Sequence, residues 1–174
     1  FVAKGKIQEI TLVEGRDVIV EISHQPHKDD CQGDRFYLSV EDEIGLQNVR
    51  FIDPVPKSEV FKYISASEMG MSVLKKVDAF KTVYSNKTFD YMSCKVPVLM
   101  AIDGVSRELV EKANAGVYVE PENIQEFNSI LRDCMNHKEL LLSQGLNGFN
   151  YAKANFDRQA LAAKYLESIE KLFN

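Results

Sequence analysis

The segment with the clearest chemical potential is residues 85–92, which read Ser-Asn-Lys-Thr-Phe-Asp-Tyr-Met. We expect a helix over residues 86–94, beginning at Asn86, and helix N-termini bind phosphates through unpaired N–H groups and the positive end of the dipole. Lys87 adds a mobile cation there. Asp90 lies three residues further on the same face, where its carboxylate could accept hydrogen bonds from two ribose hydroxyls. The same spacing also fits an ordinary amphipathic helix with a Lys87–Asp90 ion pair, and spacing alone does not decide between them.

A second candidate phosphate-binding turn is Gly104-Val105-Ser106, which follows an apolar strand pattern and opens the next predicted helix. Backbone N–H groups at that helix start could face a sugar phosphate. An equally good interpretation is a plain loop in which Ser106 acts as the N-cap.

A metal site is a weaker interpretation of His24, His27, Asp29, Asp30 and Cys31. Zinc sites usually show ordered ligand spacing, whereas this polar loop is a mixed set interrupted by a proline. We therefore expect no metal and no cofactor.

The elements that must position these residues alternate along the chain, which is typical of an α/β domain with a parallel sheet covered by helices. Helical patterns alone follow residue 121, and Asp157 is a plausible cap of the last helix. The predicted strands are 35–40, 48–53, 69–74, 96–101 and 116–119, with 1–4 as the end of another. The predicted helices are 13–23, 57–65, 86–94, 106–113, 122–135, 138–152 and 157–173.

Composition limits the classes of function. The chain has 174 residues, of which 45% are hydrophobic and 27% charged, so one ordinary globular domain is expected. A net charge of -5 argues against nucleic-acid binding, and no apolar run reaches the roughly 20 residues of a transmembrane helix. The three cysteines are an odd number and show no paired spacing, which fits reduced thiols in a cytoplasmic protein. Because the chain begins at Phe1 rather than Met, we expect a preceding portion.

Beyond these patterns, the sequence resembles a family. The run SNKTFDYMSCKVPVL, followed by DGVSRELVEKANAGVYVEPEN, looks like the C-terminal domain of group 1 retaining glycosyltransferases that build bacterial O-antigens and capsules. LQNVRF and SEMG upstream, and NG and NFD downstream, are similar to further motifs of that family. The resemblance covers the chain from Leu46 to its end.

The resemblance implies a Rossmann-like parallel sheet with a helical C-terminal extension, one half of a two-domain GT-B enzyme. Residues 1–156 would form the nucleotide-sugar-binding domain. Residues 157–174 would form a helix that crosses to an amino-terminal, acceptor-binding domain outside this chain. Because only one wall of the active-site cleft would be present, we expect the fragment alone to be inactive.

The family's motifs also imply site residues. The helix acid that holds the ribose falls on Asp90, although most relatives have Glu. Lys87 would neutralise the diphosphate. Lys81 and Thr82 would contact the sugar, although Thr82 stands where relatives often have a second Glu. Gly104 and Ser106, with Asn86, would bind phosphate through helix N–H groups.

The amino-terminal part matches the family less well. Lys6 fits a basic residue that relatives direct at the diphosphate, whereas Glu14 stands where a second basic residue is usual, and that reversed charge would be unfavourable near a diphosphate. Val55 lies where the family's nucleobase pocket begins, and the base is held there mainly by backbone groups.

We therefore expect a donor domain for a nucleoside diphosphate sugar, such as a UDP-sugar, that serves transfer to a lipid-linked or glycan acceptor. No catalytic residue can be assigned in this half. The enzyme would be cytoplasmic, and peripheral at the inner membrane surface through its other domain. The alternatives are a non-catalytic nucleotide-binding or interaction domain and, ranked lower, a sugar-nucleotide epimerase fragment, because the three histidines do not fall at the expected rim.

Overall fold

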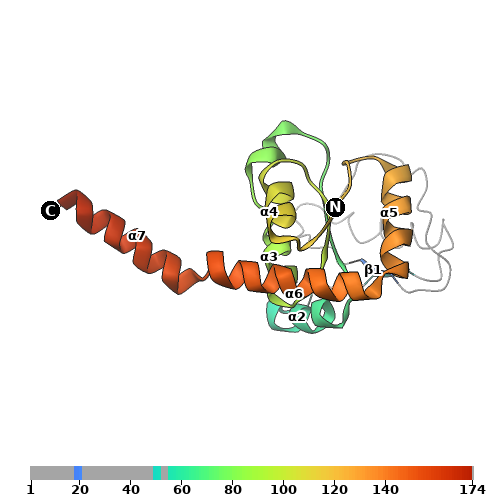
Figure 1. Ribbon diagram of the computed structural model, residues 1–174, viewed down its shortest axis with the longest axis horizontal. Coiled ribbons are helices and arrows are strands. Elements are labelled where there is room, and N and C mark those ends of the chain that lie inside the picture. Colours follow the sequence, from blue (N-terminus) through green and yellow to red (C-terminus); the bar gives the residue numbers. More distant parts are fainter. Residues whose placement is uncertain (1–17, 21–48, 52–54, 174) are drawn as a thin grey trace, which may run out of the picture. The chain divides into compact units, whose positions relative to one another are not determined.

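The computed structural model describes residues 18–20, 49–51 and 55–173 (Figure 1). The chain divides into two compact units, Phe1–Pro56 and Lys57–Asn174. In the first unit, β1 (Val18–Val20) pairs in parallel with β2 (Val49–Phe51), with Val18 opposite Val49. The strand predicted at 48–53 is confirmed. The strands predicted at 1–4 and 35–40 lie outside the described residues.

One expected element of the first unit is wrong. Residues 18–20, placed in a predicted helix over 13–23, form β1. Val18, Ile19 and Val20 are consecutive β-branched residues, whose restricted side-chain rotamers favour an extended backbone. The apparent helical spacing in this short window was therefore misleading.

A parallel three-stranded sheet forms the centre of the second unit, in the order β3-β4-β5. The strands are β3 (Gly70–Val73), β4 (Val98–Ala101) and β5 (Gly116–Tyr118), and each lies inside a predicted strand. Gly70 pairs with Val98, and Val98 pairs with Gly116. Each connection between neighbouring strands contains a helix, as parallel pairing requires.

The helices also confirm the sequence predictions within a few residues. They are α2 (Lys57–Ala66), α3 (Asn86–Ser93), α4 (Val105–Ala113), α5 (Ile124–Asn136), α6 (Lys138–Asn155) and α7 (Arg158–Phe173). A short 3-10 helix, η1 (Asp78–Thr82), was not predicted and lies in the connection between β3 and α3. No strand follows β5 in the described part of the chain, as expected.

The core lies on both faces of β4, whose four residues are all buried. Val98 and Met100 pack in a cluster with residues of α2, α3 and α4, whereas Leu99 and Ala101 pack with residues of α5. Side chains alternate between the faces of a strand, so this division places α5 on the opposite face of the sheet (Figure 1). Burial on both faces explains why this strand is a continuous apolar run.

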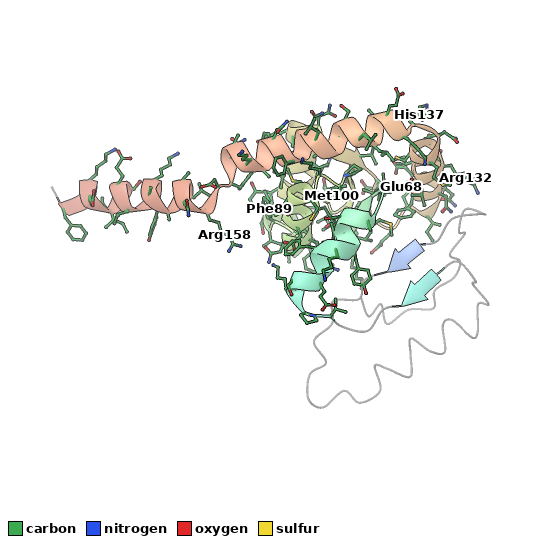
Figure 2. The ribbon with its side chains drawn as sticks, turned by 90° about the horizontal axis from the view of Figure 1, so that it is seen from below. Glu68, Phe89, Met100, Arg132, His137 and Arg158 are labelled. Carbon is green, nitrogen blue, oxygen red and sulfur yellow. The ribbon has the colours of Figure 1, made fainter. Side chains whose placement is uncertain are left out.

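Helix α6 packs against the sheet and its covering helices, with contacts to α3, α4, α5 and β5. A Cβ atom at Gly145 would lie 2.8 Å from the backbone carbon of Lys95, so only glycine permits this close approach. Lys138 at the start of α6 pairs with Glu68 at 3.1 Å. Figure 2 shows Met100 within the packed side chains and His137 at the exposed start of α6.

The last helix, α7, differs from the others because none of its residues is buried. Its start is capped as the sequence predicts: Asp157 Oδ1 accepts a hydrogen bond from the backbone N–H of Ala160 at 2.9 Å. The helix therefore has a defined beginning but depends little on packing within this chain.

Candidate functional site

The candidate site lies at the carboxyl edge of the β3-β4-β5 sheet, where parallel sheets generally bind ligands. The loops that follow the three strands meet at this edge, and η1 contacts α4. A small hollow is lined by residues of all three loops, including Lys75, Lys76 and Lys81. The edge thus combines backbone turns with three lysines, of which Lys76 and Lys81 are paired with carboxylates.

Both predicted phosphate-binding turns are helix starts at this edge. Asn86 is the first residue of α3 and is exposed, and Gly104 is the residue before α4. The first N–H groups of each helix have no partner within the helix. Helices of this kind present a partial positive charge to any ligand at the edge.

Neither helix has a side-chain cap at its N-terminus. The residues before α3 and α4 are Ser85 and Gly104, and neither makes a side-chain cap bond. Ser106 lies inside α4, and its fully buried hydroxyl donates to the carbonyl oxygen of Val83 at 3.0 Å. The interpretation of Ser106 as an N-cap is therefore wrong.

Asp90 lies in α3 with its side chain 30% exposed, and Lys57 Nζ of α2 is 3.7 Å from its Oδ1 atom. The expected Lys87–Asp90 ion pair is absent. Lys87 is half-buried and makes no ion pair with any residue that the structure describes. The acid keeps an exposed carboxylate edge, and the cation remains available.

The predicted sugar contacts lie in η1. Lys81 Nζ is 3.0 Å from Asp78 Oδ1, and this hydrogen bond raises the pKa of Lys81 above its ordinary value. Thr82 Oγ1 donates to the carbonyl oxygen of Ala79 at 3.4 Å, within its own turn. Both side chains are exposed, and Lys81 also contacts the start of α4 through its backbone.

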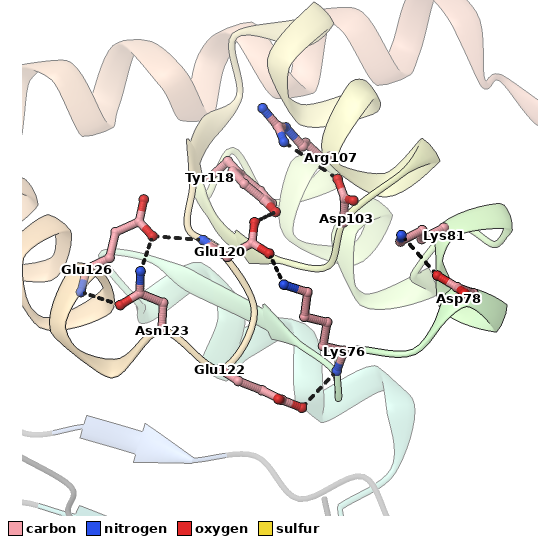
Figure 3. Close-up of polar contacts among 10 residues, drawn as sticks. All are labelled: Lys76, Asp78, Lys81, Asp103, Arg107, Tyr118, Glu120, Glu122, Asn123 and Glu126. Atoms are coloured by element: carbon pink, nitrogen blue, oxygen red, sulfur yellow. Dashed lines mark hydrogen bonds and ion pairs between the residues drawn. The ribbon is translucent and has the colours of Figure 1, made fainter.

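A second polar cluster at this edge was not predicted (Figure 3). Lys76 Nζ lies 2.6 Å from Glu120 Oε1, and Tyr118 donates its hydroxyl proton to Glu120 Oε2 at 2.8 Å. The Arg107 guanidinium stacks 4.0 Å from the centroid of the Tyr118 ring and pairs with Asp103 at 3.6 Å.

The electrostatics of this cluster follow from burial and pairing. Burial, together with the hydrogen bond to Glu120, raises the pKa of Tyr118 to about 12. The Lys76 ammonium lowers the pKa of Glu120. Tyr118 and Glu120 are two residues apart in an extended segment, so their sequence spacing could have indicated a shared face.

Other predicted residues cannot be joined to this edge. Lys6 lies outside the described residues, as do Glu14 and the histidine-containing loop at residues 24–31. Val55 is half-buried and belongs to the first compact unit. Over the described ranges, no group of three or more His, Cys, Asp or Glu side chains could hold a metal ion.

Helices on both faces of a parallel sheet define a Rossmann-like α/β domain, and its fold is that of the GT-B glycosyltransferases. Sucrose-phosphate synthase from Thermosynechococcus elongatus superimposes with a TM-score of 0.73 at 18% identity, covering 89% of this chain and 38% of that one. HepE from Anabaena in complex with UDP superimposes with a TM-score of 0.72 at 18% identity, and the match covers 90% of this chain and 41% of HepE. The C-terminal domain of the group 1 glycosyl transferase LpcC from Francisella tularensis superimposes with a TM-score of 0.61 at 16% identity. That match covers 76% of this chain and 66% of the LpcC chain.

The family model described as glycosyl transferase-like matches residues 19–167, which is most of the chain. The chain therefore belongs to the glycosyl transferase-like family. No curated protein matches its sequence. The chain spans about two fifths of the length of the first two structures it resembles. No helix in the described part of the chain is both long and apolar enough to cross a membrane.

Proposed function

We propose that this chain is the donor-binding part of a glycosyltransferase and binds a nucleoside diphosphate sugar, specifically a UDP-sugar. The observation that carries the proposal is the start of α3, where free N–H groups, the half-buried Lys87 and the partly exposed Asp90 lie on one short helix. Family membership supports the transferase chemistry, and HepE, which shares the fold, has been solved with UDP and with UDP-glucose.

In this proposal the ribose, the diphosphate and the sugar of the ligand would each contact a different set of residues. The Asp90 carboxylate would accept hydrogen bonds from the ribose hydroxyls. The N–H groups of Asn86, Gly104 and Ser106, together with Lys87, would hold the diphosphate. Lys81 and Thr82 of η1 would face the sugar. For Lys6 and Val55 the family resemblance implies contacts with the diphosphate and the nucleobase.

The chemistry that this half supplies is stabilisation of the leaving group. When the bond from sugar to diphosphate breaks, negative charge accumulates on the diphosphate. Fixed N–H dipoles and cations stabilise that charge most in the transition state, which lowers the barrier. No nucleophile or general base is required from this chain.

The acceptor, a glycan or a lipid-linked sugar, would bind to a second domain outside this sequence. In this proposal residues 1–156 belong to the donor domain, and residues 157–174 connect it to the acceptor-binding domain. A lipid-linked acceptor would place the enzyme in the cytoplasm at the inner membrane surface.

One observation favours a second candidate, a nucleotide-binding domain without transferase activity. Thr82 replaces an acid that relatives often use for the sugar, and its hydroxyl already bonds to Ala79. Such a domain would bind the nucleotide but would not distinguish UDP from UDP-sugars.

Calorimetric titration of the chain with UDP, GDP, UDP-glucose and UDP-N-acetylglucosamine tests the proposal. We expect UDP to bind more tightly than GDP and one UDP-sugar to bind differently from UDP. Equal affinity for UDP and every UDP-sugar would favour the non-catalytic alternative. No heat with any of the four at millimolar concentration would refute nucleotide binding.

A further inference from the structure

We propose that Ser106 is a positioning residue of the donor site, whose buried hydroxyl fixes the start of α3 and thereby places the N–H groups that hold the diphosphate. This inference rests on the proposed function. It assigns Ser106 a role that acts through its neighbours, in addition to the backbone contact expected from its sequence position.

The hydroxyl of Ser106 joins segments that are distant in the sequence. Its Oγ atom accepts a hydrogen bond from the backbone N–H of Ser85 at 3.0 Å and donates one to the carbonyl oxygen of Val83 at 3.0 Å. The side chain is fully buried, so no ligand reaches it directly. One residue of α4 therefore holds both ends of the turn that leads into α3.

Three further hydroxyls extend this contact to β3. Ser72 Oγ donates to Ser85 Oγ at 2.8 Å, and Thr88 Oγ1 lies 3.5 Å from Ser72 Oγ. Ser72 is 3% exposed and Thr88 is fully buried. We call these four side chains, Ser72, Ser85, Thr88 and Ser106, the hydroxyl junction. It links a strand and two helix starts within the sheet's carboxyl edge.

The junction matters for binding because it occupies the N–H group of Ser85 and leaves the next ones free. Asn86 and Lys87 follow directly as the first residues of α3, where helix N–H groups lack partners within the helix. If the turn at Val83–Ser85 moved, these groups and the Lys87 side chain would move with it. Displacements near 1 Å are enough to weaken preorganised electrostatic contacts severely.

Sequence reasoning could not find this role, because Ser106 lies 21 residues beyond Ser85. Its spacing is equally compatible with a cap, a core position or a ligand contact. The two hydrogen bonds of its hydroxyl and its complete burial distinguish among these possibilities.

Ser106→Ala tests the inference by comparing UDP with uridine, which lacks phosphates. We expect the affinity of the 174-residue chain for UDP to fall about tenfold, the equivalent of one buried hydrogen bond, while its affinity for uridine is unchanged. A general loss of structure would lower both affinities together. Calorimetry measures the two dissociation constants, and a thermal melt verifies that the variant is folded.

Ser93→Ala is the matched control, because Ser93 is an exposed serine at the other end of α3 that bonds to the carbonyl oxygen of Asp90. This substitution should leave the ratio of the UDP affinity to the uridine affinity unaltered. If Ser106→Ala does not fold, Ser72→Ala breaks the other half of the hydroxyl junction and should lower the same ratio.

Two outcomes overturn the inference, and they have different meanings. If the wild-type chain binds UDP and the ratio is unchanged in the folded Ser106 or Ser72 variant, the positioning role is wrong and the proposed function stands. If the wild-type chain does not bind UDP at all, the proposed function fails and the inference fails with it.

Discussion

Asp90 and Lys87 lie three residues apart on α3 but have different electrostatic surroundings. Asp90 is paired with Lys57 at 3.7 Å, and the lysine side chain is 73% exposed. Such surface pairs contribute about 0 to 1 kcal/mol, because water screens the charges and two long side chains lose freedom. A ligand that offers two hydroxyl donors would therefore displace Lys57 at little cost.

Asp90→Ala is expected to separate binding from stability. Hydrogen bonds to a charged group contribute about 1.5 to 3 kcal/mol, so UDP affinity should fall roughly ten- to hundredfold. The free energy of unfolding should change by less than about 1 kcal/mol, because only the surface pair with Lys57 is lost. Calorimetry and urea denaturation measure the two quantities.

Asp133→Ala serves as the control for that experiment, since Asp133 is exposed on α5, on the opposite face of the sheet. Its UDP affinity should equal that of the wild type. Unchanged UDP affinity in Asp90→Ala would assign Asp90 to structure alone and would remove the ribose contact from the proposal.

At the level of elements, the contact between η1 and α4 gives the candidate site its shape. Gly104 precedes α4 with a φ of 83°, a region that L-amino acids rarely adopt. A Cβ atom there would lie 2.6 Å from the Cα atom of Lys81 and would also collide with the backbone carbonyl oxygen of Lys81. The two loops can approach this closely only because Gly104 has no side chain.

Gly104→Ala should consequently destabilise the protein by about 2 to 4 kcal/mol, through a strained backbone conformation and overpacking against η1. Asn114→Gly at the other end of α4 is the contrasting variant, because Asn114 has a φ of 46° and glycine relieves that conformation. It should be neutral or slightly stabilising. Equal urea midpoints for Gly104→Ala and the wild type would show that the loops separate freely.

The elements of the second unit were predictable because their burial leaves a clear pattern in the sequence. Residues 96–101 form an apolar run because β4 is buried on both faces, and the helices show one apolar stripe each. The predicted helix at 13–23 failed because a short β-branched run, Val18–Val20, can mimic helical spacing. η1 was missed because its five residues are too few to show periodicity.

The site was predictable only in part. The order of residues in α3 suggested Asp90 and Lys87 as candidates, and their roles stay predictions; Gly104 was placed at a helix start, which the structure confirms. The partner of Asp90 could not be foreseen, because Lys57 is 33 positions earlier in the chain and reaches it through the packing of α2 on α3. Contacts of this kind depend on tertiary structure, which leaves no local spacing to detect.

For the molecule as a whole, α7 is distinguished by the apolar side chains that it exposes. Leu161, Tyr165 and Leu172, at spacings of four and seven residues, share one face of the helix and are 46%, 70% and 81% exposed. Leu166 and Phe173 are also exposed. In the proposed enzyme this apolar surface would pack on the acceptor-binding domain, and without that domain we expect no sugar transfer.

The central claim, that a nucleoside diphosphate binds at the carboxyl edge of the sheet, is tested most directly by titrating the isotope-labelled chain with UDP and following its backbone amide resonances by NMR. We expect the largest shifts at residues 85–90 and 104–106, where the helix starts, Lys87 and Asp90 would surround the ligand. Shifts confined to α5, α6 and the opposite edge of the sheet, or no shift at millimolar UDP, would contradict the claim.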